Sequence, residues 1–331
     1  MTHPALAAVD AASGRPRRAI ERDIWRAGLE AGLGEARDLP LDAHMHTFRS
    51  PDAEPDALLD AYCGVALERG IAELAITDHV DFDPLAPAYA FSTFEERQRD
   101  VREAAERWAP AGLAVRFGVE VTYERRYEED IRDWLRRHPH DFVIGSVHSG
   151  PASLYEPERV GAFVAGKSLA EVTAPYFDEV VAAARSGLFD SLGHLDVVKR
   201  WLVPHVMPEA FAAQPELYEP PLAALVDSGT ALEINTSGLR QLARETYPAA
   251  AVVARYLELG GRAVTIGSDV HRMEWFAYGL GEAYRLARSA GLAALSFRRG
   301  GDRVWVPMGS ASGSGVGTGA PGPNTGDPAS L

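Results

Sequence analysis

The sequence contains little cysteine, no long apolar run and fewer cations than anions. Cys63 is the single cysteine among 331 residues, which excludes an internal disulfide and is typical of a reducing, cytoplasmic location. No run of about eighteen uncharged apolar residues occurs, so the sequence predicts no membrane span, and it shows no secretory signal. There are 33 lysines and arginines against 47 aspartates and glutamates, which leaves a formal net charge of −14. This charge argues against a surface that binds long nucleic acid.

The composition divides the chain into three parts. Residues 1–38 form an N-terminal extension with one amphipathic helix, expected over residues 18–33. Its apolar face is expected to carry Ile20, Ile24, Trp25 and Leu29. Residues 39–308 are expected to form one large domain. Residues 309–331 are rich in glycine, serine and proline without periodicity, so we expect this tail to be disordered.

Strands and helices alternate about seven times within the large domain. The expected strands cover residues 39–45, 71–77, 113–119, 141–147, 189–192, 230–234 and 263–267. They are largely apolar rather than strictly alternating, which is typical of a parallel sheet covered by helices. Ser168 and Glu171 predict a capping box at the start of one of these helices. Residues 150–166 are expected to be an irregular insertion.

Most of the expected strands end in a histidine or an acidic residue. Residues i and i+2 of a strand point to the same side, so His44 and His46 can aim at one point, as can Asp269 and His271. The other strand-end residues of this kind are His79, Glu120, His148 and His194. Because these residues come from at least six strands, a closed or nearly closed ring is favoured over an open sheet with one crevice.

Burying so many ionisable groups together is costly unless they are paired or bind metal. Mixed imidazole and carboxylate ligands suit Zn, Fe or Mn better than Ca or Mg. The set is too large for one tetrahedral ion, so two or three ions are expected, with Glu120 as the natural bridge. Clustered ions acidify a shared water and neutralise oxygens around phosphorus, so the predicted chemistry is metal-assisted hydrolysis of a phosphate ester.

These motifs together resemble the polymerase and histidinol phosphatase (PHP) domain family. The resemblance covers residues 41–272, and the motifs that carry it stand in the family's order. They are His44-Met45-His46, Thr77-Asp78-His79, Gly118-Val119-Glu120, Ser146-Val147-His148, Gly193-His194-Leu195-Asp196 and Gly267-Ser268-Asp269-Val270-His271. The resemblance implies an α/β fold, a distorted (β/α)7 TIM-like barrel, with a trinuclear metal centre.

The resemblance also implies how the ligands divide among three divalent transition-metal ions. The first ion would take His44, His46, Glu120 and Asp269, and the second would take Glu120, His148 and His194. The third would take His79, His271 and an acidic residue, for which Asp52 is preferred and Glu54 is the alternative. Glu120, Asp269 and His271 are the expected catalytic residues.

Two further segments, residues 193–200 and 233–240, are similar to the histidinol phosphatase branch of the family. Lys199, Arg200 and Arg240 are expected to bind the substrate phosphate, although ordinary surface cations are the alternative. Glu233 is expected either to orient a ligating histidine or to form a salt bridge at a strand end. His138 and His140 belong to a polar turn and are expected to be solvated.

The predicted function is hydrolysis of a small phosphate monoester, with L-histidinol phosphate of histidine biosynthesis as the leading substrate. A PHP phosphoesterase acting on a nucleotide, an oligonucleotide or phosphotyrosine is the first alternative. A metal-binding regulatory module without catalytic activity is the second. The expected partner is a small molecule, and neither a membrane nor long nucleic acid is expected.

Overall fold

The computed structural model describes residues 15–148, 157–203 and 205–309. Its centre is a parallel sheet in the strand order β1-β2-β4-β5-β6-β7-β8, with β3 pairing beside β4. These strands are β1 (Asp42–Met45), β2 (Glu73–Ile76), β3 (His79–Val80), β4 (Ala114–Thr122), β5 (Phe142–Ser146), β6 (Ser191–Leu192), β7 (Ala231–Asn235) and β8 (Val264–Gly267). The nearly closed ring of seven strands confirms the predicted TIM-like barrel.

Hydrogen bonds between the first and last strand segments bring the ends of the sheet together. Asp269 N donates to His44 O at 2.8 Å, and His46 N donates to Val270 O at 2.9 Å. Gly267 permits this approach, because a Cβ at that position would lie 2.2 Å from the Cβ of His44. The same bonds place two of the segments that carry predicted ligands side by side.

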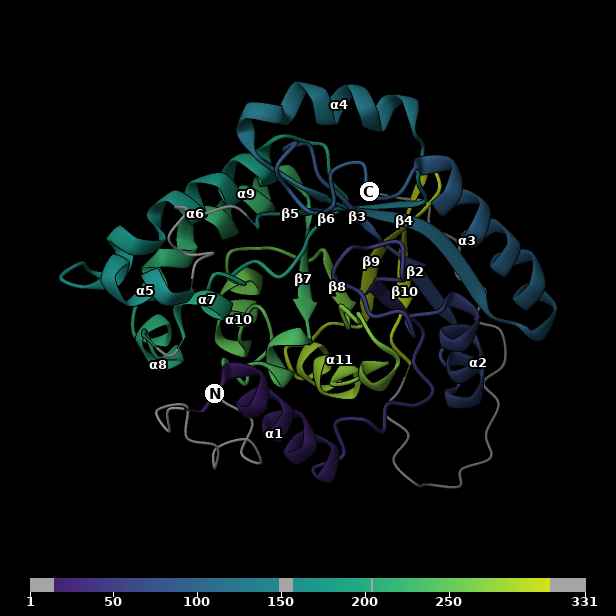
Figure 1. Cartoon of the computed structure of the whole chain (residues 1–331), viewed down its shortest axis with the longest axis horizontal. Coiled ribbons are helices and arrows are strands. Elements are labelled where there is room, and N and C mark those ends of the chain that lie inside the picture. Colours follow the sequence, from purple (N-terminus) through teal and green to yellow (C-terminus); the bar gives the residue numbers. More distant parts are fainter. Residues whose placement is uncertain (1–14, 149–156, 204, 310–331) are drawn as a thin grey trace, which may run out of the picture.

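Helices surround the barrel on its outer side (Figure 1). They are α1 (Arg17–Glu30), α2 (Leu59–Arg69), α3 (Phe94–Trp108), α4 (Glu128–Arg137), α5 (Pro157–Val164), α6 (Leu169–Arg185), α7 (Lys199–Leu202), α8 (Pro208–Ala212), α9 (Glu219–Ser228), α10 (Ala250–Glu258) and α11 (Leu280–Ser289). The predicted capping box is confirmed at α6, where Ser168 Oγ accepts from Glu171 N and the Glu171 carboxylate accepts from Ser168 N. Within the described residues, no helix is both long and apolar enough to cross a membrane.

The structure differs from the sequence-based expectation at two segments, and a third segment lies outside the described residues. Residues 157–164 of the expected irregular insertion form α5, whereas residues 149–156 lie outside the described part. Residues 302–307, for which no strand was predicted, form β10 (Asp302–Pro307), which pairs antiparallel with β9 (Ala294–Arg299). The tail expected to be disordered lies outside the described residues from position 310 onward.

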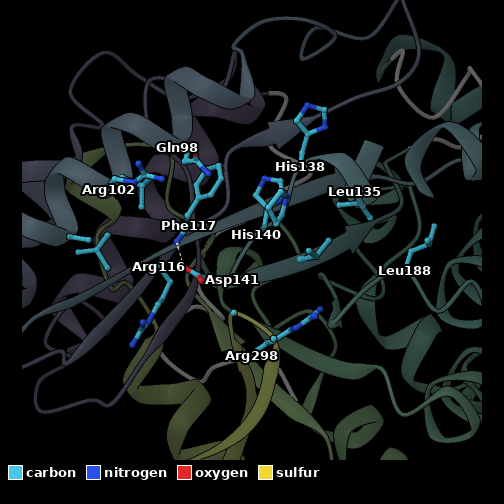
Figure 2. Close-up of a pocket in the computed structure, with 17 residues that line it drawn as sticks. Gln98, Arg102, Arg116, Phe117, Leu135, His138, His140, Asp141, Leu188 and Arg298 are labelled. Carbon is cyan, nitrogen blue, oxygen red and sulfur yellow. Dashed lines mark hydrogen bonds between the residues drawn. The ribbon is translucent and has the colours of Figure 1, made fainter. Parts of the chain in front are cut away.

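A cavity of about 690 Å³ lies where β4 and β5 begin, at the barrel end opposite the predicted ligands (Figure 2). Two arginines on its wall already have carboxylate partners. Arg116 Nε lies 2.5 Å from Glu73 Oε1, and Arg298 Nη1 lies 3.2 Å from Asp190 Oδ1. We therefore place the functional site at the other end of the barrel.

His140, on the wall of this cavity, is not solvated, so that prediction is wrong. Both of its ring nitrogens are buried without a hydrogen-bond partner among the described residues. Its ring centroid lies 4.6 Å from that of Phe117 and 5.4 Å from that of Trp134. Burial lowers the pKa of His140 from its ordinary 6.5 to about 3.

Removing His140 is expected to make the fold less sensitive to acid. Because the folded-state pKa is the lower one, the unfolded chain binds this proton first. Neutral His140 therefore makes its full contribution to the free energy of unfolding above pH 6.5, and this contribution is lost as the pH falls toward 3. At pH 5 the loss is about 2 kcal/mol. His140→Phe should remove that loss, whereas the matched variant His138→Phe should not. Urea unfolding at pH 7.5 and pH 5 measures the loss of unfolding free energy between these pH values. Equal losses in wild type and His140→Phe would contradict the low pKa assigned to His140.

Candidate metal centre

The nine side chains predicted as metal ligands lie at the carboxyl ends of the barrel strands. Their positions are His44 in β1 and His46 just after it, Asp52 in the next loop, His79 in β3, Glu120 in β4, His148 after β5, His194 after β6, and Asp269 and His271 after β8. Eight of them form four groups of three whose ligand atoms lie within 4.8 Å of one another. These groups are His44–His46–Glu120, His44–His194–Asp269, His79–Glu120–His148 and His46–His79–His271.

Glu120 lies at the centre of the cluster and is fully buried. Five imidazoles surround its carboxylate. For Oε2 the distances are 2.9 Å to His79 Nδ1 and 3.2 Å to the Nε2 atoms of His44 and His46, and for Oε1 they are 2.9 Å to His194 Nε2 and 3.4 Å to His148 Nε2. Glu120 is therefore positioned to bridge two ions.

The cluster has more nitrogen and oxygen atoms able to bind a metal ion than hydrogen bonds among its own residues can use. Glu120 Oε2 accepts no hydrogen bond of acceptable geometry in the described residues, although three imidazoles surround it. The Nε2 atoms of His44 and His46 face each other at 3.0 Å. Metal cations between these atoms would bind their free lone pairs. The residues therefore fit transition-metal ions.

The electrostatics of the cluster keep its carboxylates ionised. Burial alone would lower the pKa of His44, but Glu233 and Glu120 outweigh it and hold that pKa well above its usual value. Burial, reinforced by the neighbouring His271, holds the pKa of His46 well below its usual value. Burial alone would raise the pKa of Glu120, yet the surrounding histidines hold it well below its usual range. The centre is therefore an anionic site that favours positive charge, whether protons or metal ions.

Glu233, in β7, orients two of the histidines. Its Oε1 lies 2.7 Å from His44 Nδ1, and its Oε2 accepts from the backbone N of His194 at 2.7 Å and from Asn235 Nδ2 at 3.0 Å. With Nδ1 of His44 engaged in this way, Nε2 faces the cluster. This is the orienting role expected for Glu233 rather than the salt bridge.

A second orienting carboxylate, Asp78, was not predicted. It accepts from Thr47 N at 2.7 Å and from Ser50 Oγ at 2.8 Å, and Ser50 Oγ lies 3.1 Å from His46 Nδ1. Asp78 thereby fixes the loop after β1 and, through Ser50, the ring of His46. Its place beside His79 in the motif was a signal, whereas nothing in the sequence around Ser50 indicated this role.

Of the two candidate acids after β1, Asp52 faces the cluster. Its Oδ1 lies 3.5 Å from His79 Nε2, and its Oδ2 lies 3.2 Å from His271 Nε2. Burial would raise the pKa of Asp52, but His271 and His79 outweigh it and hold this pKa far below its usual range. Glu54 is instead paired with Arg272 at 3.1 Å. The geometry therefore supports Asp52 as the additional ligand.

A PHP domain model matches residues 42–237, more than half of the chain. The chain belongs to the PHP domain family. It is 30% identical over 260 residues to the "Probable histidinol-phosphatase" of Deinococcus radiodurans, with 78% of this chain and 96% of the relative covered. It is 28% identical over 265 residues to the "Histidinol-phosphatase" of Lactococcus lactis, with 77% and 93% covered.

A solved structure shares the fold of this PHP domain. It is the histidinol phosphate phosphatase of Lactococcus lactis subsp. lactis, complexed with Zn, L-histidinol and phosphate. The TM-score is 0.68 at 23% sequence identity, and the match covers 80% of this chain and 98% of that chain. This likeness confirms the barrel architecture.

A cavity of about 520 Å³ opens beside the predicted metal ligands of this PHP domain. Seven of the predicted ligands lie on its wall together with Arg200 and several acidic residues. The predicted ligands on the wall are Asp52, His79, Glu120, His148, His194, Asp269 and His271. The cavity therefore gives a small molecule direct access to the cluster.

The three cations expected to bind phosphate have different surroundings in this PHP domain. Arg200 is exposed on the cavity wall, with no ion pair among the described residues. Lys199 is buried, and its Nζ lies 2.7 Å from Asp196 and 2.6 Å from Glu245. Because two carboxylates already neutralise it, this arrangement argues against a phosphate-binding role for Lys199.

Arg240, the third of these cations, lies beside the predicted ligand Asp269 and holds its backbone. Its Nη1 donates to Ser268 O at 3.0 Å, and its Nη2 donates to Asp269 O at 2.5 Å. The ring of Trp275 lies 4.6 Å from its Cζ, and burial lowers the pKa of Arg240 to about 10. Asp269 has a positive φ of 54°, a conformation that surrounding contacts must hold. Arg240 supplies two such contacts.

Proposed function

We propose that this chain is a metal-dependent phosphatase that hydrolyses L-histidinol phosphate to L-histidinol and phosphate, a step of histidine biosynthesis. The observation that carries the proposal is the convergence of nine imidazoles and carboxylates beside a cavity large enough for a small molecule. The curated relatives, named for histidinol phosphatase activity, match more than three quarters of the chain. We assign the activity to the barrel, residues 39–308, and a cytoplasmic location is supported by the single, buried Cys63.

Three ions would divide the ligands of this centre. The first set is His44, His46, Glu120 and Asp269, the second is Glu120, His148 and His194, and the third is Asp52, His79 and His271. Divalent ions held there would supply Lewis acidity to a water and to the oxygens of a phosphoryl group. Glu120, Asp269 and His271 belong to these sets and are the proposed catalytic residues.

The protein's own side chains would orient the substrate. Arg200 on the cavity wall and Arg240 beside Asp269 would place positive charge around the phosphate. Asp81 also lines the cavity, and its Oδ1 is buried without a hydrogen-bond partner in the described residues. A carboxylate on the cavity wall suits an ammonium group, which favours an amino alcohol phosphate over a nucleotide.

Purified protein is expected to carry two to three transition-metal ions per chain. The reason is that the cluster offers nine ligand side chains, more than one ion can use. Elemental analysis after reconstitution with Zn, Mn or Fe, followed by gel filtration, measures the stoichiometry. A value of one ion or fewer under all three conditions would contradict the multinuclear centre.

A phosphate-release assay with the metal-loaded protein tests the proposed substrate. The panel should contain histidinol phosphate, p-nitrophenyl phosphate, nucleoside monophosphates and phosphotyrosine, each with and without added metal. We expect the highest kcat/KM for histidinol phosphate and no activity after chelation. A higher kcat/KM for a nucleotide or for phosphotyrosine would reject the substrate and retain the phosphatase. No phosphate release from any ester would reject the enzyme and favour a regulatory metal-binding module.

A further inference from the structure

Helix α1 lies outside the matched residues of the PHP domain and packs at one edge of the barrel (Figure 1). Its buried residues are Ile20, Ile24 and Gly28, whereas Leu29, expected on the same face, is 38% exposed. Ile20 and Ile24 belong to a small apolar cluster separate from the main core. The other buried members of this cluster are Leu33, Val203, Leu239, Leu242 and Tyr278. The helix therefore covers the turns behind the metal centre rather than the barrel strands.

The contact between α1 and Tyr278 is unusually close. A Cβ at Gly28 would lie 1.8 Å from the Tyr278 hydroxyl, so only glycine lets the helix rest on this ring. The segment after α1 also joins the same region, because Gly279 N donates to Leu33 O at 2.7 Å. Tyr278 O in turn accepts from Thr236 Oγ1 at 2.6 Å. The helix is thus connected to the chain that follows β7.

The turn after β7 carries Arg240. This 3-10 turn, η6 (Ser237–Arg240), packs against α1, and Leu239 contributes its side chain to the shared apolar cluster. Arg240, the next residue, donates to the carbonyls of Ser268 and Asp269. A four-residue turn has few hydrogen bonds of its own, so its position depends on what packs against it. A continuous set of contacts therefore leads from Ile24 through Leu239 and Arg240 to the ligand Asp269.

We propose that α1 is a positioning element of the active site, in which Ile24 and Gly28 hold the η6 turn so that Arg240 keeps Asp269 in its ligating conformation. The inference rests on the proposed function for its catalytic readout, but not for its metal-binding readout. Neither Ile24 nor Gly28 touches the substrate cavity, so both act through Arg240. Loss of the helix contact should resemble loss of the Arg240 guanidinium.

A double-mutant cycle of Ile24→Asp and Arg240→Gln in the full chain tests this coupling. Each single variant is expected to lower kcat for histidinol phosphate and the affinity for Zn by about tenfold or more, the usual effect of losing an outer support of a metal site. The double variant should be no worse than Arg240→Gln alone. Zn affinity is measured by competition with a chelator, and circular dichroism and Tm confirm that each variant is folded.

Leu29→Asp is the matched control, because it makes the same chemical change at an exposed position of the same helix. It should keep kcat and Zn affinity within about twofold of wild type. If Ile24→Asp does not fold, Gly28→Ala replaces it in the cycle, and Ile24→Val should keep wild-type values. The proposal is overturned if the folded helix variant has the Zn affinity and kcat of wild type. It is also overturned if the fold-loss in the double variant equals the product of the two single-variant losses. If wild type releases no phosphate, the proposed function fails, while the Zn affinities still decide the role of α1.

Discussion

Glu120→Ala is expected to lower kcat for phosphate release by about 10³-fold or more, equivalent to about 4 kcal/mol of transition-state stabilisation. The reason is that five imidazoles converge on this one carboxylate, which is fully buried. Without it, two sets of ligands lose their shared anion and the buried histidines lose the charge that balances them. The variant should also bind fewer metal ions per chain, which elemental analysis measures beside kcat.

Asp52→Ala is the comparison for Glu120→Ala, because both changes remove one carboxylate from the same cluster. The side chain of Asp52 is 56% exposed, and His79 and His271 are the two histidines of the cluster that it approaches. Water can replace an exposed ligand more readily than a buried one, so the loss in kcat should be at least tenfold smaller than for Glu120→Ala. Equal and small losses in the two variants would show that Glu120 does not bridge the ions.

Glu233→Gln is expected to weaken Zn binding and to lower kcat by roughly 10- to 100-fold, although Glu233 is not itself a proposed ligand. Its two oxygens accept from His44 Nδ1 and from the backbone N of His194. Glutamine has nearly the same shape, but its amide group presents N–H to one of these donors. The resulting mismatch in a buried site should turn His44 away from the cluster.

The control for Glu233→Gln is Glu73→Gln, which alters another buried strand carboxylate. Glu73 pairs with Arg116 and Arg299 near the opposite end of the barrel. This change should lower Tm without changing Zn affinity, which separates a general loss of stability from an effect on the metal centre. If Glu233→Gln binds Zn as tightly as wild type, the orientation of His44 does not depend on Glu233.

The barrel and the convergence of the candidate ligands could be predicted from the sequence because both depend on local patterns. Apolar runs such as residues 263–267 mark buried strands, and parallel strands place their carboxyl ends on one face. A polar residue directly after such a run, as in Asp269 and His271, is therefore directed to a common point regardless of the details of packing. Glu233 was singled out for the same reason, since it lies in a strand that ends at this face, but the sequence left open whether it orients a histidine or forms a salt bridge.

The roles of the supporting residues were decided by tertiary structure, because they depend on partners far away in the chain. Lys199 is neutralised by Glu245, which lies 46 residues further on, and no local pattern distinguishes it from the exposed Arg200. Asp52 and Glu54 have similar chemistry, and only the fold turns one toward His271 and the other toward Arg272.

The same holds for α1 and for His140, whose surroundings come from distant segments. The periodicity of α1 predicts an apolar face, but it does not identify Tyr278 and Leu239 as what that face covers. The turn that carries His140 is polar in sequence, yet Phe117 and Trp134 bury its ring. Sequence by itself therefore determined which groups meet in the candidate metal centre, since strand ends are a local signal. Only the tertiary structure decided which residues hold them, since packing partners are not local.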